Sequence, residues 1–207
     1  MLDNYSKNED NIIYQINIEK IQYDLDYVNS RYSIYPTTNS MSHLRLGYLL
    51  GILNFIPNKL LDIGYGNVDF LKVASTIIPN CYGNDIEPAY PLTNNVNFIS
   101  NIYDNHFDVV CFFDSLEHFD NIYEIKELKT EYIYISVPWC HYVNDEWFKN
   151  WKHRRENEHL WHFDLPALVN FMKSINFKYI AHSNIEDVIR KSDSDLPNIL
   201  TALFKKM

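Results

Sequence analysis

The chain has 207 residues, 46% of them hydrophobic and 22% charged, with a formal net charge of −9 at pH 7. This length and composition predict one globular domain with a full core, and the acidic balance argues against non-specific nucleic-acid binding, which needs clustered cations. Three cysteines without paired spacing, and apolar runs shorter than the ~18 residues of a membrane span, favour a cytoplasmic protein with reduced thiols.

The beginning of the chain gives weak structural signals. Residues 1–11 are polar and are expected to be disordered, and residues 12–35 show no clear pattern. Apolar residues then recur at helical spacing from Met41 to Phe55, after good N-cap residues and before Pro57, so a helix is predicted there. Residues 1–40 are therefore interpreted as an extension, partly disordered or lid-like.

From residue 60 onward, short apolar runs alternate with helical patterns. Strands are predicted at 60–63, 81–86, 96–100, 107–113, 132–137, 177–182 and 197–204, helices at 69–78, 122–129 and 166–175, and a helical turn at 185–191. Continuous apolar strands that alternate with helices indicate an α/β fold, with a mostly parallel sheet covered on both faces.

A tight turn follows the first of these strands. It carries Gly64 and Gly66, and glycine allows positive φ and a close approach of backbone to a ligand. Asp85 ends the next strand, 21 residues after Gly64, near the ~20-residue spacing of an acid that binds ribose hydroxyls. A third glycine is absent from this turn, and Val68 stands two residues after Gly66.

A second group of polar residues follows the strand at 107–113. In Asp114-x-x-Glu117-His118, a helical turn would bring all three side chains to one side. Two carboxylates and an imidazole suit a divalent ion such as Mg²⁺ or Mn²⁺. The alternative is a metal-free site in which His118 acts as a base or orients the substrate.

Taken in order, these motifs resemble class I S-adenosylmethionine (SAM)-dependent methyltransferases of the broad small-molecule group, over roughly residues 41–207. The matching segments are LDIGYGN (61–67), YGNDIEP (82–88), FDVVCFFDSLEHF (107–119), ISVP (135–138) and HLWHFDLPALVNFMKSINFKYI (159–180). The resemblance implies a Rossmann-like doubly wound sheet with an antiparallel last strand.

The resemblance also implies roles for individual residues. The first glycine turn would surround the methionine part of SAM, Asp85 would hold the ribose, Ile86 would pack on adenine and Asn101 would meet the adenine edge. The residues expected to bind the cofactor are Asp62, Gly64, Tyr65, Gly66, Asp85, Ile86, Asn101 and Asp114.

The acid-x-x-Glu-His pattern is similar to the metal ligands of ubiquinone-pathway O-methyltransferases and small-RNA 2′-O-methyltransferases. By that resemblance His159 would join Asp114, Glu117 and His118 as a fourth ligand. A bound ion would lower the pKa of the attacking hydroxyl. His118, Asp114 and Glu117 are the expected catalytic residues.

Residues 139–163 form a polar, aromatic insertion that is expected to cover the acceptor, since loops after sheet strands carry specificity. The residues expected to contact the acceptor are His141, Trp151, Arg154, Arg155 and His159; the alternative is a solvated surface loop. In related enzymes the region of Tyr32, Tyr35, His43 and Arg45 folds over cofactor or substrate, although ordinary surface positions on the helix are equally compatible.

The sequence therefore predicts a SAM-dependent methyltransferase that acts on a hydroxyl of a small polar molecule, such as a sugar or glycan precursor. The absence of a catalytic cysteine motif and of an Asn-Pro-Pro-Tyr-type amine motif favours a hydroxyl. One alternative is an RNA 2′-O-methyltransferase that uses a divalent metal. Another is a SAM-binding subunit without catalysis, whose insertion recruits a partner.

Overall fold

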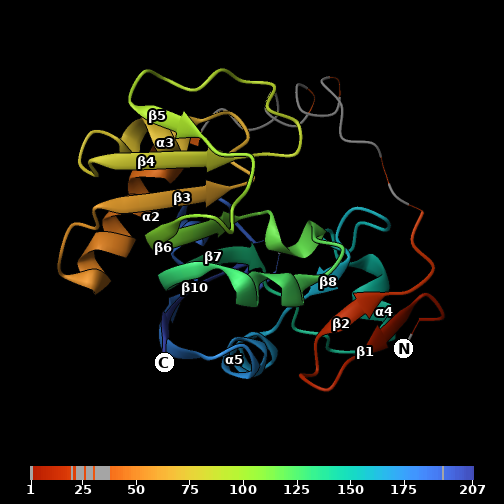
Figure 1. The fold of residues 1–207 in the computed structure, drawn as a ribbon. Helices are drawn as coiled ribbons and strands as arrows, with labels where there is room; N and C mark the ends of the chain where they lie inside the picture. The colour runs from red at the N-terminus through yellow and green to blue at the C-terminus, as the bar shows by residue number, and fades with distance from the viewer. Residues whose placement is uncertain (1, 20, 22–25, 27–29, 31–37, 193) are drawn as a thin grey trace.

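A seven-stranded sheet forms the centre of the computed structural model, which describes residues 2–19, 21, 26, 30, 38–192 and 194–207 (Figure 1). The strand order is β5-β4-β3-β6-β7-β10-β9, and the last strand, β10, is antiparallel to both neighbours. The strands are β3 (Lys59–Ile63), β4 (Asn80–Asn84), β5 (Val96–Phe98), β6 (His106–Phe113), β7 (Lys129–Pro138), β9 (Phe177–Ser183) and β10 (Ile199–Lys206). The predicted mostly parallel sheet with an antiparallel last strand is confirmed.

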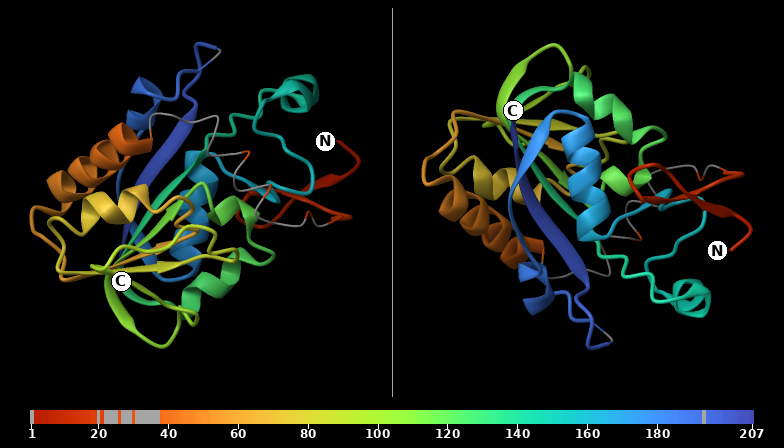
Figure 2. Two further views of the ribbon diagram at one scale, coloured as in Figure 1. Left: turned by 90° about the horizontal axis from the view of Figure 1, so that it is seen from above. Right: turned by 90° about the horizontal axis from the view of Figure 1, so that it is seen from below.

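Helices cover both faces of this sheet (Figure 2). On one face, α2 (Thr38–Leu53) and α3 (Asp69–Ala74) enclose a core that includes Leu49 and Leu71. On the other face, α5 (Leu165–Ser174) and the 3-10 helix η2 (Ile122–Glu127) enclose a second core. Two further 3-10 helices, η1 (Leu116–His118) and η3 (Ile185–Val188), follow β6 and β9.

Several predicted boundaries differ from the structure. The helix expected at 69–78 ends at Ala74, where the Ser75 and Thr76 hydroxyls donate to the carbonyls of Lys72 (3.1 Å) and Val73 (2.7 Å). Such side-chain bonds compete with continuation of a helix. The helix expected at 122–129 is a 3-10 helix that ends at Glu127, because the chain is extended in β7 from Lys129.

The expectation of disorder in residues 1–11 is wrong, because residues 5–7 form a strand. The strand β1 (Tyr5–Lys7) pairs with β2 (Ile13–Gln15), which pairs with β8 (Trp161–His162) of the insertion. The Tyr5 ring packs edge-on against Phe148 of α4 (Asp145–Asn150), with centroids 5.0 Å apart. The insertion thus folds with the beginning of the chain around a small aromatic core instead of standing alone.

The three cysteines are buried free thiols, as predicted for Cys81 and Cys111. Burial raises the pKa of Cys81 and of Cys140 to about 12, so both stay protonated. Within the described ranges, no helix has the length and apolar character needed to cross a membrane. Tyr32 and Tyr35 lie outside the described residues.

Candidate active site

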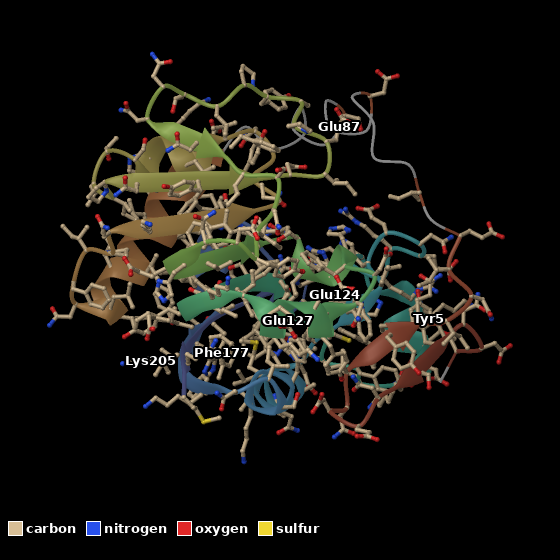
Figure 3. The ribbon with its side chains drawn as sticks, viewed as in Figure 1. Tyr5, Glu87, Glu124, Glu127, Phe177 and Lys205 are labelled. Atoms are coloured by element: carbon tan, nitrogen blue, oxygen red, sulfur yellow. The ribbon has the colours of Figure 1, made fainter. Side chains whose placement is uncertain are left out.

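One cavity of about 660 Å³ opens at the carboxyl ends of β3, β4 and β6. Its wall is formed by the loops after these strands, by α2 and by part of the insertion, namely residues 153, 155 and 157–160. Figure 3 shows two lining residues at different heights: Glu87, beyond the end of β4, and Glu124, in η2 below it. This is the edge at which open α/β sheets bind ligands.

The glycine turn after β3 forms one end of the cavity. Gly64 and Gly66 have φ values of +79° and +54°, in the left-handed region that favours glycine. The backbone N–H of Gly66 donates to Asp85 Oδ2 at 2.9 Å. The acid after β4 therefore holds the turn after β3, and the two motifs predicted to act together are in contact.

Val68 adopts the left-handed conformation, with φ at +69°, although its side chain is β-branched. This conformation is strained for such a residue. The side chain is 1% exposed and belongs to the core under α2 and α3. Packing thus offsets the strain at this position of the turn.

Two further side chains line this end of the cavity, one of them exposed and the other buried. Ile86 lines the cavity and is 82% exposed, as expected of a residue that packs on a ligand ring. Asp62 is 2% exposed, and its Oδ1 has no hydrogen-bond partner in the described part of the chain. Burial raises the pKa of Asp62 to about 7, against the opposing effect of Arg45.

Asp114 follows β6 in a left-handed conformation (φ +51°) and contacts two arginines. Its Oδ1 and Oδ2 accept from Arg190 Nη1 at 2.7 and 2.8 Å, and Oδ2 also accepts from Arg45 Nη2 at 3.1 Å. Burial opposes ionisation, but Arg190 and Arg45 lower the pKa of Asp114 to about 2. Its carboxylate is therefore engaged in ion pairs.

Glu117, His118 and His159 lie together, and the two histidines line the cavity. Their ligand atoms fall within 4.8 Å of one another, and the two imidazole rings meet edge-on with centroids 4.8 Å apart. Glu117 is 1% exposed, and neither of its carboxylate oxygens has a hydrogen-bond partner among the described residues. The backbone N–H of Leu160 donates to the Glu117 carbonyl at 2.7 Å, which joins the insertion to η1.

The two imidazoles of this group are uncharged at neutral pH. Burial lowers the pKa of His118 and of His159. His118 Nδ1 lies 2.8 Å from the Glu158 carbonyl oxygen, which can only accept, so Nδ1 carries the proton. The lone pair of the neutral ring is then on Nε2, the arrangement required of a proton acceptor.

The other predicted site residues are placed unevenly. Arg155 lines the cavity, as His159 does, whereas Asn101, His141, Trp151 and Arg154 are outside its lining. His141 Nε2 donates to the Pro197 carbonyl at 2.7 Å. Asn101 Oδ1 accepts from the backbone N–H of Tyr103 at 3.1 Å, as in a local turn.

Sequence reasoning missed several residues near the cavity. Arg190, His153 and Ser115 line it, and Glu186 lies behind it. Ser115 lies within the matching segment 107–119, where no role is predicted for it, and the other three belong to no recognisable motif. Only the pattern of charges in IEDVIR (185–190), with an acid and an arginine four residues apart, indicates that ionic contacts form there.

Comparison with known proteins places this chain in a family. Residues 41–182 match the family model described as "Methyltransferase domain". The plantazolicin methyltransferase BpumL, solved with a desmethylPZN analog and SAH, is 18% identical with a TM-score of 0.60, over 88% of this chain and 92% of that one. Among curated protein sequences, none matches this chain.

Two other solved structures share the fold. A putative methyltransferase solved in complex with the Haloferax volcanii Trm112 activator is 13% identical, with a TM-score of 0.63 over 90% of this chain and 99% of that one. Magnesium protoporphyrin IX methyltransferase from Synechocystis PCC 6803, with bound SAH, is 12% identical, with a TM-score of 0.57 over 91% and 90%.

Proposed function

The chain belongs to the methyltransferase domain family, with the Rossmann-like class I fold, and we propose that it transfers a methyl group from SAM to a hydroxyl of a small polar acceptor. A sugar or glycan precursor is the favoured class. One observation carries the proposal: a single cavity joins Gly64, Gly66 and Asp85 to His118 and His159.

The residues at the glycine end fit the three parts of SAM. Asp85, already oriented by the Gly66 N–H, presents carboxylate oxygens for ribose hydroxyls, and Ile86 offers an exposed apolar surface for adenine. Asp62 Oδ1 suits the ammonium group of the methionine part, and Arg45, which lines the same cavity, suits its carboxylate. When bound, SAM would supply an electrophilic methyl group for transfer to the acceptor.

His118 is the proposed proton acceptor. A hydroxyl group attacks a methyl carbon well only as its proton leaves, and a neutral imidazole at the cavity wall takes that proton. The Glu158 carbonyl keeps Nδ1 protonated, so Nε2 is the accepting nitrogen. The enclosing wall of the cavity would also orient the hydroxyl toward the methyl group, which lowers the activation barrier further.

The group of Glu117, His118 and His159 also fits a divalent ion. A buried carboxylate without a partner and two neutral imidazoles are a favourable ligand set, and nitrogen ligands suit Mn²⁺ better than Mg²⁺. A bound ion would lower the pKa of the acceptor hydroxyl. Asp114 is outside this group, because two arginines hold its carboxylate.

Elemental analysis of protein equilibrated with Mn²⁺ tests the metal site without an activity assay. We expect about one ion per chain in the wild type and less than a fifth of that in Glu117→Gln and His159→Ala. Arg154→Ala, outside the cavity, serves as the control. Equal metal content in all four proteins would remove the metal from the proposal.

The far end of the cavity favours a polyhydroxylated acceptor. Its lining includes the Phe119 ring and the polar side chains of Asp120, Asn121, Glu124 and Asn157. Carboxylates accept hydrogen bonds from sugar hydroxyls, and amides both accept and donate them. An aromatic face packs against the ring carbons of a sugar.

The contacts of the basic segment weigh against RNA. Arg154 Nη1 lies 2.6 Å from Glu156 Oε1, and Arg155 Nη1 lies 2.8 Å from Glu158 Oε1. Cations neutralised in this way give little attraction to phosphates. The similarity of the Glu117, His118 and His159 group to ligands of RNA methyltransferases nevertheless makes RNA the second candidate.

A methyl-transfer assay separates these candidates. Labelled SAM is incubated with monosaccharides, with nucleotide sugars and with short RNAs, using His118→Ala as the control. Transfer to a sugar that His118→Ala loses supports the proposal, whereas salt-sensitive transfer to RNA alone overturns the acceptor class. SAH binding without transfer to any acceptor supports a non-catalytic subunit.

A further inference from the structure

Glu186 is a fully buried carboxylate that does not line the cavity but contacts a residue that does. Its Oε1 accepts from Arg45 Nε at 2.7 Å and from Ser136 Oγ at 2.6 Å. Its Oε2 accepts from Arg45 Nη2 at 2.9 Å and from Arg190 Nη1 at 3.3 Å. Burial opposes ionisation, but Arg45 and Arg190 lower the pKa of Glu186, so it carries a negative charge.

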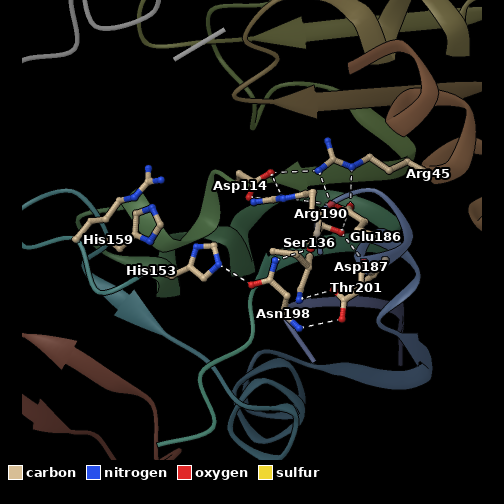
Figure 4. Close-up of polar contacts among 12 residues, drawn as sticks. Arg45, Asp114, Ser136, His153, His159, Glu186, Asp187, Arg190, Asn198 and Thr201 are labelled. Carbon is tan, nitrogen blue, oxygen red and sulfur yellow. Dashed lines mark hydrogen bonds and ion pairs between the residues drawn. The ribbon is translucent and has the colours of Figure 1, made fainter. Parts of the chain in front are cut away.

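Glu186 is the fully buried member of a partly exposed cluster that also contains Arg45, Asp114 and Arg190 (Figure 4). Two guanidinium groups face two carboxylates, so the charges balance. Such clusters rarely add stability over apolar packing, because desolvation offsets the ionic attraction. The position of this cluster beside the cavity therefore points to a role in orienting side chains.

The cluster fixes the orientation of Arg45. A guanidinium group is planar, so holding Nε and Nη2 on one carboxylate also fixes the direction of Nη1. Nη1 has no hydrogen-bond partner in the structure of the described residues, and Figure 4 shows it pointing away from both carboxylates. The Phe113 ring supports the group from one side, with Cζ 4.4 Å from the ring centroid.

We propose that Glu186 is a positioning residue for cofactor binding, which holds the Arg45 guanidinium so that Nη1 meets the carboxylate of the methionine part of SAM. This inference rests on the carboxylate role given to Arg45 in the proposed function. A side chain that is held before binding loses less rotamer entropy on binding, so the contact contributes more to affinity. The connection between β9 and β10 thereby contributes to a site at the ends of β3 and β4.

Two ligands isolate this effect in calorimetric titrations. SAH carries the amino-acid chain, and 5′-methylthioadenosine lacks it. We expect Glu186→Gln to bind SAH about tenfold more weakly than the wild type and to bind 5′-methylthioadenosine within about twofold. A general loosening of the fold would weaken both ligands together.

Two further variants keep the experiment decisive. Glu186→Asp retains the charge but shortens the side chain, and it should show the same selective loss if Glu186→Gln does not fold. Asp108→Asn is the matched control, because Asp108 Oδ2 accepts from the backbone N–H groups of Asn58 (2.6 Å) and Lys59 (2.9 Å) at the opposite end of β3. It should leave both affinities unchanged.

Unchanged SAH affinity in the Glu186 variants, or equal loss of both ligands, would overturn the positioning role. Arg45→Met tests the premise separately. If Arg45→Met weakens SAH selectively and the Glu186 variants do not, only the positioning role fails. If Arg45→Met also leaves SAH binding intact, the carboxylate assignment in the proposed function fails.

Discussion

A Cβ atom placed on Gly64 would lie 2.7 Å from the Cβ atom of Ser115. Gly64 belongs to the turn after β3, and Ser115 precedes η1, which carries Glu117 and His118. The glycine turn therefore packs against the loop of the proposed catalytic residues, and the absence of a side chain at Gly64 makes this contact possible. This contact explains the glycine in two ways, since φ at Gly64 is also +79°.

The contact predicts the effect of Gly64→Ala. The added methyl group clashes with Ser115, and the alanine backbone is strained at positive φ. The turn must therefore shift, and SAH affinity should fall by about tenfold or more. Ser115→Gly in the same protein removes the steric part and should restore part of the affinity in calorimetry. Unchanged binding by Gly64→Ala alone would show that the turn does not approach the cofactor.

Val68 gives a prediction about stability. In the middle of a helix or strand, a protein with glycine is about 0.5–1 kcal/mol less stable than one with alanine. At position 68, however, glycine relieves the strain of the left-handed conformation, which costs other residues roughly 1–2 kcal/mol. Urea unfolding should therefore show Val68→Gly at least as stable as Val68→Ala, and a clearly less stable glycine variant would contradict the strained conformation.

The raised pKa of Asp62 predicts pH-dependent binding. Its carboxyl titrates at about 7, and only the ionised form attracts the ammonium group of SAH. SAH affinity should therefore rise between pH 6 and pH 8, and Asp62→Asn should remove the slope. A slope that persists in Asp62→Asn would assign the dependence to another group.

The same shift has a defined sign for stability. Between an unfolded-chain pKa of about 4 and the folded pKa of about 7, the folded protein holds a proton that the unfolded chain has lost. The contribution of Asp62 to the stability of the ligand-free protein therefore decreases as pH rises through this window. Asp62→Asn should lack this component in unfolding measurements.

Ile12 tests whether the first strands belong to the domain. It is 0% exposed and contacts the core that contains α5 and β7. Ile12→Ala should lower the free energy of unfolding by about 2–4 kcal/mol. Ile18→Ala is the control, because Ile18 is an exposed residue of the same segment. Equally small effects of both substitutions would contradict the packing of residues 5–15 against the core.

The features that the sequence predicted are those that local patterns encode. The apolar run at Phe107–Phe113 and the pair of the glycine turn with Asp85 are contiguous or regularly spaced, and both lie where expected. The strands β1 and β2 have three residues each, which is too short for a clear period. Their partner, β8, lies in an insertion whose pattern predicted only a loop.

The ionic cluster could not be predicted for a different reason. Glu186 contacts Arg45 from 141 residues away, and Arg190 contacts Asp114 from 76 residues away. Because β9 runs parallel to β6 and β7, the residues that follow it reach the edge of the sheet at which Asp114 lies. A charge pattern does not specify its partner. Asp114 was expected among the ligands of a metal, but the two arginines that engage it carry no sequence signal for that contact.

Calorimetric titration of the purified protein with SAH tests the central claim most directly. We expect binding of one SAH per chain. We expect Asp85→Ala to lose about tenfold or more in affinity, because the Asp85 carboxylate holds the glycine turn and, in the proposed function, the ribose. Absence of SAH binding to the folded wild-type protein, with and without Mn²⁺, would contradict the methyl-transfer function.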